Sequence, residues 1–190
     1  AVSGISAALE RKVWIFINKT KPIYPNMYIM LVGNSGTRKS TTTDAIVDLI
    51  SEVPGIHKIA NQMSAAAMIE SVRDAGDAKT FNFLNKTFRN SSTFAFTNEA
   101  ATMLKNNTQL QELMTDFYDC GSPSNWSEVP AWNKKTLSGG DIDIYNPCLN
   151  FLGCSTPKWL NEIVGESSVE GGFIPRFLLV SAKTLAETTG

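Results

Sequence analysis

Hydrophobic residues fall into two kinds of pattern that alternate along the chain. Five short, largely apolar runs have the length of strands, and the first of them is continuous, which is typical of a strand in a sheet that is covered on both faces. These runs occupy residues 27–32, 56–60, 93–97, 148–154 and 177–181. Stretches with helical spacing lie before and between them, chiefly at 2–9, 40–52, from 64 onward, 103–117 and from 156 onward. The pattern predicts an α/β fold with three layers, in which helices flank a mainly parallel five-stranded sheet.

Local signals mark several helix boundaries. Ser64 is a good N-cap for the apolar stripe that follows it, and Thr156-Pro157 combines an N-cap with a first-turn proline. Pro54-Gly55 ends the helical pattern of 40–52, and Gly165 ends the pattern that starts at 156. Asn106-Asn107 interrupts the pattern of 103–117, so we expect a break there.

Three segments outside these runs are harder to interpret. Residues 12–17 are apolar and fit either a strand or the end of a helix. Phe81, Leu84 and Phe88 fall on one face of a helix, which predicts helical packing within 75–92. Residues 134–145 read as a hairpin with its turn at 138–141.

Composition narrows the class of protein. The chain has 190 residues, of which 43% are hydrophobic and 18% charged, which predicts one globular domain over 1–190 with a lead-in at 1–25 and a core at 26–183. The formal charge of -1 excludes a generally basic nucleic-acid-binding surface. Three cysteines without metal-site spacing predict a reducing, cytoplasmic compartment, and no apolar run is long enough for a membrane span. Because the chain starts at Ala1, we expect a fragment of a longer protein.

The strongest chemical signal is the loop after the first apolar run. It matches the phosphate-binding pattern G-x-x-x-x-G-K-[ST], with arginine in place of the last glycine. It also stands between a predicted strand and a predicted helix, as that pattern requires; the alternative is a Gly/Ser-rich turn before an ordinary helix. The residues expected to hold a nucleotide are Gly33, Asn34, Ser35, Gly36, Thr37, Arg38, Lys39, Ser40 and Thr41.

Each part of this loop has a physical task. The glycines allow a tight turn whose N–H groups form a nest for anionic oxygens, and the helix start adds unpaired N–H groups. Lys39 is expected to reach the β- and γ-phosphates of ATP, Ser40 to bind Mg²⁺, and Thr41 to contact the α-phosphate. Arg38 adds a cation near the phosphates or points into solvent.

A second signal is the polar pair that ends the third apolar run. Asn98-Glu99 follows residues 93–97, about where a phosphate loop needs an acid opposite the γ-phosphate and Mg²⁺. We expect Glu99 to orient or deprotonate the attacking water. Asn98 can accept a hydrogen bond from metal-bound water but lacks the negative charge of an aspartate.

These signals, with Gly153-Cys-Ser-Thr-Pro157 and Ile174-Pro-Arg-Phe177, occur in the order typical of one family. The chain resembles the ring-forming P-loop ATPases of the AAA+ and superfamily III helicase type, and most of all the ATPase domains of phage and plasmid primase-helicases. The resemblance covers nearly the whole chain. It implies a P-loop NTPase fold of the AAA+/RecA-like kind within a longer replication protein, in the host cytoplasm if the protein is phage-encoded.

The resemblance also assigns roles to residues near the end of the chain. Thr156, or its neighbour Ser155, is similar to the polar sensor of the γ-phosphate. Arg176 resembles the arginine finger that reaches the ATP of a neighbouring subunit, which implies a homo-oligomeric ring, such as a hexamer. A surface arginine at a strand start is the alternative for Arg176.

In such helicases the hairpin before the sensor strand holds single-stranded nucleic acid. Here that hairpin carries Lys134 and Lys135, expected to contact DNA phosphates, with Trp126 or Trp132 available to stack on bases. A solvated hairpin without a ligand is the alternative. The implied activity is Mg²⁺-dependent ATP hydrolysis that drives movement along single-stranded or forked DNA. The rival functions are an ATP-binding switch or assembly module and a small-molecule kinase.

Overall fold

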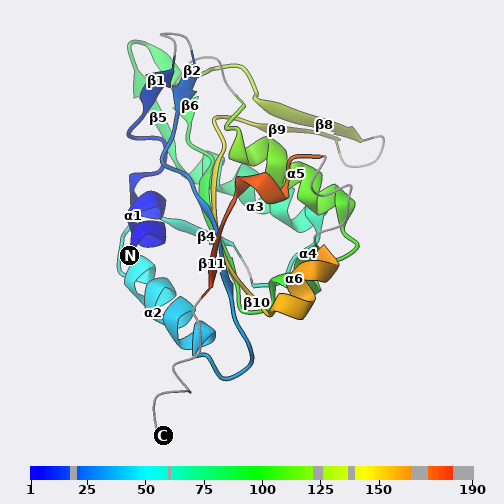
Figure 1. The fold of residues 1–190 in the computed structure, drawn as a ribbon. Helices are drawn as coiled ribbons and strands as arrows, with labels where there is room; N and C mark the ends of the chain where they lie inside the picture. Colours follow the sequence, from blue (N-terminus) through cyan, green and yellow to red (C-terminus); the bar gives the residue numbers. More distant parts are fainter. Residues whose placement is uncertain (18–20, 60, 122–125, 137–139, 164–170, 182–190) are drawn as a thin grey trace, which may run out of the picture.

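A computed structural model describes residues 1–17, 21–59, 61–121, 126–136, 140–163 and 171–181. Its centre is a sheet of five parallel strands in the order β11-β3-β10-β7-β4 (Figure 1). All five predicted strands are therefore confirmed, with ends that shift by no more than one residue. Their bounds are β3 (Tyr28–Val32), β4 (His57–Ile59), β7 (Ser92–Thr97), β10 (Cys148–Ser155) and β11 (Phe177–Ser181).

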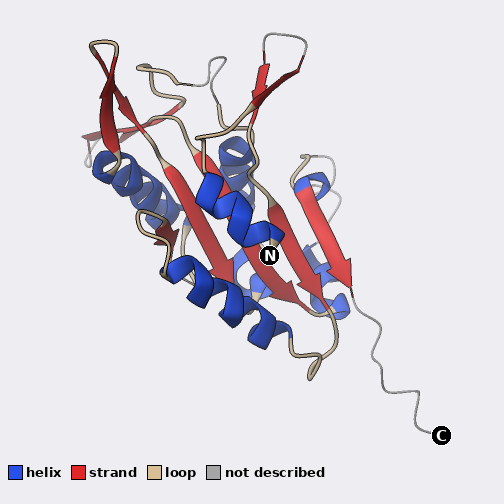
Figure 2. Ribbon diagram, turned by 90° about the vertical axis from the view of Figure 1, so that its left-hand side faces the viewer, coloured by secondary structure: helices blue, strands red, loops and turns tan. Residues whose placement is uncertain are grey.

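Helices cover both faces of the sheet, as the continuous apolar run at 27–32 predicts (Figure 2). One face packs against α1 (Val2–Leu9) and α2 (Lys39–Ser51). The other packs against α3 (Ala65–Ala78), α4 (Ala100–Leu104) and α5 (Thr108–Tyr118), and α6 (Pro157–Ile163) lies beside α4. The three-layer α/β architecture is thus confirmed, and it is compatible with a P-loop NTPase-like fold.

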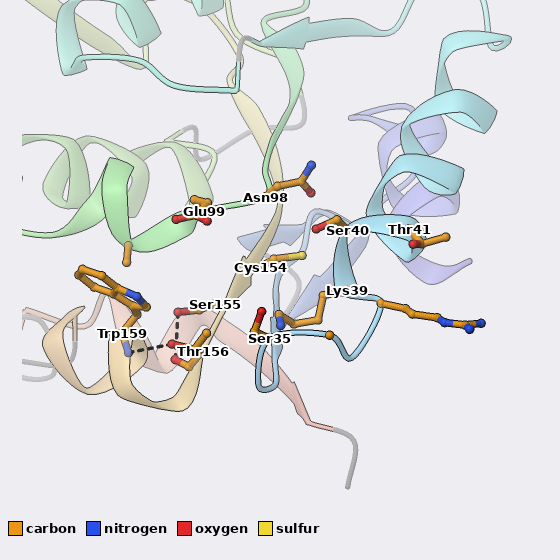
Figure 3. Close-up of a pocket in the computed structure, with 13 residues that line it drawn as sticks. Ser35, Lys39, Ser40, Thr41, Asn98, Glu99, Cys154, Ser155, Thr156 and Trp159 are labelled. Atoms are coloured by element: carbon orange, nitrogen blue, oxygen red, sulfur yellow. Dashed lines mark hydrogen bonds between the residues drawn. The ribbon is translucent and has the colours of Figure 1, made fainter. Parts of the chain in front are cut away.

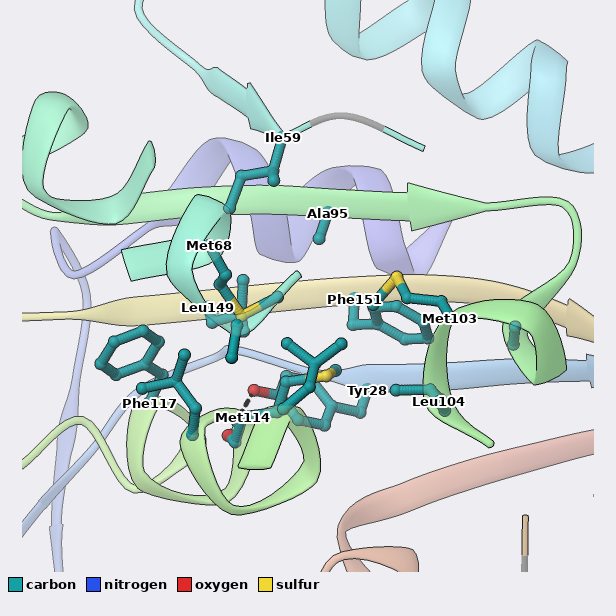
Figure 4. Packing of buried hydrophobic residues seen from close by; sticks show 14 of the residues in the cluster. Tyr28, Ile59, Met68, Ala95, Met103, Leu104, Met114, Phe117, Leu149 and Phe151 are labelled. Carbon is teal, nitrogen blue, oxygen red and sulfur yellow. Dashed lines mark hydrogen bonds between the residues drawn. The ribbon is translucent and has the colours of Figure 1, made fainter. Parts of the chain in front are cut away.

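The larger hydrophobic core lies between the sheet and the α3–α5 layer (Figure 4). Tyr28 and Phe151, from neighbouring strands, are buried at its centre with ring centroids 6.0 Å apart. The Tyr28 hydroxyl donates a 2.7 Å hydrogen bond to the backbone carbonyl of Met114 in α5. Each large side chain buried in this way contributes roughly 1.5–3 kcal/mol. The core therefore fixes the sheet against the helices that follow β7.

Several predicted helix boundaries are confirmed, whereas the predicted helix end at Gly165 lies outside the described residues. Ser64 accepts a hydrogen bond from a backbone N–H three residues further on and caps α3. Thr156 caps α6 in the same way. Asn106 has a positive φ of 57°, and Asn107 caps α5, so the helical pattern of 103–117 breaks where predicted. These caps satisfy backbone donors that a helix start leaves unpaired.

Three antiparallel hairpins project from the end of the sheet where the parallel strands begin (Figures 1 and 2). The first pairs β1 (Ile15–Ile17) with β2 (Lys21–Ile23), so residues 12–17 end in a strand. The third pairs β8 (Trp132–Thr136) with β9 (Gly140–Ile144), which confirms the predicted hairpin strands. Residues 138 and 139 of its predicted turn lie outside the described residues.

The middle hairpin corrects one prediction. Residues expected to pack as a helical face within 75–92 instead form β5 (Thr80–Phe83) and β6 (Lys86–Arg89) after α3 ends. Leu84 and Asn85 have φ of 49° and 61°, the two positive values that a two-residue hairpin turn of this class needs. The turn contains no glycine, which is why the helical spacing of the aromatic residues prevailed in the sequence interpretation.

A short 3₁₀ turn, η1 (Ile174–Arg176), leads into the edge strand β11. Among the described residues, every helix is too short or too polar to cross a lipid bilayer. Arg176, the predicted arginine finger, is the last residue of η1 and directly precedes β11.

Candidate functional site

A pocket of about 380 Å³ lies at the carboxyl end of β3, β7 and β10 (Figure 3). This is the edge of a parallel sheet at which α/β proteins generally bind ligands. It brings together the loop after β3, the residues after β7 and the end of β10. Its lining residues are Ser35, Gly36, Arg38, Lys39, Ser40, Thr41, Asn98, Glu99, Ala101, Cys154, Ser155, Thr156 and Trp159.

The loop between β3 and α2 is held tightly at its start. The Gly33 N–H donates a 3.1 Å hydrogen bond to the carbonyl of Ser155, so the loop is tied to β10. A Cβ at Gly33 would lie 2.8 Å from the Thr37 hydroxyl oxygen, too close for any side chain without a shift. Gly36 has φ of +84°, in the left-handed region that favours glycine. Gly36 is thus favoured by its backbone conformation, and Gly33 by the close approach of the Thr37 side chain.

Arg38 takes up the conformation that a glycine usually supplies. Its φ of 58° and ψ of 27° are left-handed, and its side chain is exposed at the pocket. A non-glycine residue in this region costs roughly 1–2 kcal/mol. The loop therefore accepts a backbone strain at Arg38 and gains a cation at the mouth of the pocket.

Lys39, the first residue of α2, folds back over the loop. Its ammonium group donates 2.8 Å hydrogen bonds to the carbonyls of Gly33 and Asn34 and lies 3.3 Å from the Thr37 hydroxyl. The positive charge is thus centred on the concave side of the loop. An anionic group there would meet the ammonium group and the start of α2 together.

The first turn of α2 has one polar side and one buried anchor. The hydroxyl-bearing Ser40 and Thr41 are exposed to the pocket, whereas Thr43 is fully buried with its hydroxyl 3.0 Å from the Cys154 sulfur. Burial raises the pKa of the Cys154 thiol, although the Thr43 hydrogen bond and Lys39 act the other way. Cys154 is therefore a protonated packing residue and a poor nucleophile at neutral pH.

Glu99 and Asn98 reach the pocket from the end of β7. Glu99 is exposed at the N-terminus of α4, and its backbone N–H donates to the Thr97 hydroxyl at 3.2 Å. Asn98 points toward Ser40 across the pocket edge (Figure 3). Its side-chain oxygen is buried and has no hydrogen-bond partner within the part of the chain that the structure describes.

This unpaired oxygen bears on the predicted Mg²⁺ ion. A buried acceptor without a partner is costly, so it is expected to serve a ligand or a water. The Ser40 hydroxyl, the Asn98 oxygen and the Glu99 carboxylate form the all-oxygen set that Mg²⁺ prefers. The residues present therefore fit the ion. No group of three or more His, Cys, Asp or Glu side chains suited to a metal occurs among the described residues, so any ion would need further ligands from a phosphate or from water.

The end of β10 supplies the residues predicted to sense the γ-phosphate. Ser155 is buried, and its hydroxyl donates to the Thr156 carbonyl at 3.2 Å. The Thr156 hydroxyl accepts a 3.3 Å bond from the Trp159 N–H, which leaves its proton able to point into the pocket. Of the two candidates, Thr156 is thus the better placed to donate to a ligand.

Two side chains at the site were not singled out from the sequence. Trp159 in α6 lines the pocket with 41% of its surface exposed, and the Lys105 ammonium group lies 5.1 Å from its ring. Asp44, one helical turn after Ser40, accepts a 3.4 Å hydrogen bond from the Asn98 side-chain amide. The only signal for Asp44 was its spacing of four residues from Ser40, which any helix with an acidic residue shares.

Arg176 lies at the opposite end of the sheet from this pocket. It precedes β11, which runs parallel to β3, so it lies near the start of β3 and away from the loop that follows that strand. Its guanidinium group pairs with Asp119 at 2.7 Å and donates to the Gly172 carbonyl at 2.6 Å. Arg176 therefore makes no contribution to the pocket of its own chain, and its role toward a neighbour's pocket stays a prediction.

The predicted DNA-binding residues lie on β8, away from the pocket. Lys135 is exposed and 3.8 Å from Asp141, while Lys134 is half-buried. Trp132 packs on the Phe117 ring at 6.0 Å, and Trp126 packs on an aromatic residue of β5 at 4.9 Å. Both tryptophans thus already make ring contacts within the chain, and the two lysines stay candidates.

Comparisons with known proteins add no assignment. No protein-family model matches the sequence, and no curated protein matches it at a significant level. The interpretation of the pocket therefore depends on the chemistry of its own residues.

Proposed function

We propose that this chain binds and hydrolyses ATP with Mg²⁺ at the pocket formed by β3, β7 and β10. The observation that carries the proposal is the meeting, in one pocket, of Lys39 from the loop, Glu99 from β7 and Thr156 from β10. These residues are about 60 positions or more apart in sequence. A volume of about 380 Å³ is within the range of small-molecule sites.

Binding of the triphosphate would rest on the loop and the start of α2. The Gly33 and Thr37 N–H groups already donate to the carbonyls of Ser155 and Asn34. Other backbone N–H groups of the loop, with the Lys39 ammonium group, would hold the β- and γ-phosphates, while Thr41 would face the α-phosphate. Ser40 and Asn98 would hold Mg²⁺. The ion, when bound, neutralises charge that develops on the phosphate oxygens.

Hydrolysis would depend on Glu99 and Thr156. Glu99 is exposed and lines the pocket, so its carboxylate could accept a proton from water or orient the water. The Thr156 hydroxyl would donate to the γ-phosphate or to that water. General-base catalysis of this kind contributes roughly 10²–10⁴-fold to a rate.

The ring and its action on DNA are parts of the same proposal. Arg176 lies at the far end of the sheet from its own pocket, so under this proposal it would act on the ATP of a second subunit. Lys134 and Lys135 on β8 are the residues proposed to contact single-stranded DNA. Coupling of ATP hydrolysis in the ring to movement along DNA would make the chain the motor domain of a replication helicase.

The test is ATP turnover by the wild-type chain and by Glu99→Gln, with Mg²⁺, with and without single-stranded DNA. Glu99→Gln keeps the shape of the side chain but removes the base, so ATP affinity is expected to stay within about threefold and turnover to fall roughly 10²-fold or more. Equal turnover by the two proteins would exclude Glu99 as the base. Molecular mass in solution, measured with and without ATP, tests the ring.

A second function is favoured by Asn98. Because this residue brings no negative charge to the proposed metal site, the chain could bind ATP firmly and hydrolyse it slowly, as a switch or assembly module would. Tight ATP binding with slow turnover that DNA does not stimulate is the result expected for the switch. DNA-stimulated turnover is the result expected for the motor.

A further inference from the structure

The orientation of the Asn98 side-chain amide is set by its hydrogen bond to Asp44. Its nitrogen donates to the Asp44 carboxylate at 3.4 Å, and its oxygen is buried on the other side without a partner among the described residues. A carboxylate can only accept hydrogen bonds. The nitrogen therefore faces Asp44, and the oxygen faces Ser40 and the pocket (Figure 3).

Asp44 also carries the charge that Asn98 lacks. It lies on α2 four residues after Ser40, so the two side chains share one face of the helix. Asp44 does not line the pocket itself and stands behind Asn98. The negative charge of Asp44 thus lies close to the proposed metal site. It is separated from that site by the side chain of Asn98, which occupies the position of a direct aspartate ligand.

We propose that Asp44 is a positioning residue for the Mg²⁺ site, which aims the Asn98 oxygen at the ion and polarises the amide toward it. The inference rests on the proposed function and deepens it. Groups that hydrogen-bond to metal ligands orient them and raise their donor strength, and their loss typically costs 10–100-fold in metal affinity. The pair Asn98–Asp44 would then do the work of a single aspartate.

The test uses Mn²⁺ as a spectroscopic substitute for Mg²⁺. Binding of Mn²⁺ to the chain with a non-hydrolysable ATP analogue is measured by electron paramagnetic resonance for the wild type, Asp44→Asn and Asp48→Asn. Asp44→Asn is expected to weaken Mn²⁺ binding at least tenfold. Asp48→Asn is the matched control, because it removes the same charge from α2 one turn further from the loop. It is expected to change binding less than threefold.

A charge-exchange variant separates positioning from a general loss of stability. Asn98→Asp in the Asp44→Asn background moves the carboxylate to the position of the direct ligand and is expected to restore Mn²⁺ binding to within about threefold of the wild type. Asp44→Asn with unchanged Mn²⁺ affinity, or Asp48→Asn with an equal loss, would overturn the role of Asp44 alone. Failure of the wild type to bind the analogue with Mn²⁺ would overturn the proposed function as well.

Discussion

The two ends of the parallel sheet differ in how their charged and polar side chains are used. At the carboxyl end, the Asn98 oxygen lacks a partner and Glu99 faces the pocket, while Lys39 is held only by loop carbonyls and the Thr37 hydroxyl, within the described residues. At the amino end, Arg176 and Asp119 pair with each other. Backbone strain does not follow this contrast, since left-handed residues stand both in the phosphate loop, at Arg38, and at the amino end, at Cys120 and Asn146.

This difference distinguishes residues that are available to a ligand from residues that hold the fold together. Polar groups without a partner cost stability, and a ligand can supply the partner that the fold does not. Paired groups, in contrast, hold elements together; Arg11, for example, is fully buried and donates to the carbonyls of Cys120 and Pro147. The carboxyl end is therefore the candidate site, and at the amino end the resemblance predicts a part in ATP hydrolysis for Arg176.

The largest expected effect is that of replacing Arg176, a paired residue of the amino end for which a part in hydrolysis is predicted. If Arg176 serves the pocket of a neighbouring subunit, Arg176→Ala lowers ATP turnover roughly 10³-fold while ATP binding persists, because an arginine finger stabilises charge only in the transition state. Turnover at several protein concentrations measures the effect.

The matched control is Asp119→Asn, which removes the ion pair but keeps the arginine. Its turnover is expected to remain within about tenfold of the wild type. Equal turnover by Arg176→Ala and the wild type would contradict the arginine-finger role and leave Arg176 with a structural role only.

The next effect concerns the tight turn of the loop. Gly33→Ala places a Cβ 2.8 Å from the Thr37 hydroxyl oxygen, so the loop must shift. Its N–H groups would then no longer point toward the phosphates. A misplacement of about 1 Å can cost 10²-fold, and we expect a loss of that order in ATP affinity, measured by calorimetry.

Gly4→Ala in α1 serves as the control for this variant. A Cβ there would meet its nearest neighbour, Ile50, at an ordinary 3.9 Å, so ATP affinity is expected to be unchanged. Similar affinities for both alanine variants would contradict the close fit of the loop.

Much of the fold could be predicted because its signals are local. The five parallel strands follow short, largely apolar runs of the sequence, and the caps at Ser64 and Thr156 directly precede the helices that they start. The hairpin at 80–89 was missed because its turn uses Leu84-Asn85 with positive φ, a conformation for which leucine gives no signal. Periodicity of the aromatic residues alone then favoured a helix.

The candidate site could be predicted only where a motif spans adjacent positions. The loop of residues 33–41 is such a motif, and the Asn98-Glu99 pair is found by its place after an apolar strand. Asp44 and Trp159 reach the site through the packing of α2 and α6 against the strands, and contacts between elements leave no pattern in one sequence. The pairing of Arg176 with Asp119, 57 residues apart, was invisible for the same reason.

The smallest expected effect concerns the strained backbone at Arg38. Arg38→Gly relieves the left-handed conformation at the end of the loop, so the free energy of unfolding is expected to rise by about 1 kcal/mol, measured by urea denaturation. ATP affinity is expected to fall by a few-fold at most, because only the exposed cation is lost. A lower stability for this variant would show that the Arg38 side chain makes contacts that outweigh the strain.

The central claim is that the loop after β3 holds a triphosphate through Lys39. Its most direct test is calorimetric titration of ATP, with Mg²⁺, into the wild-type chain and into Lys39→Ala, with equal thermal stability of the two proteins checked first. We predict saturable binding of one ATP per chain to the wild type and at least 10²-fold weaker binding to the variant, because the variant loses the charge centred on the loop. Equal affinity for ATP, or no binding to either folded protein, would contradict the account.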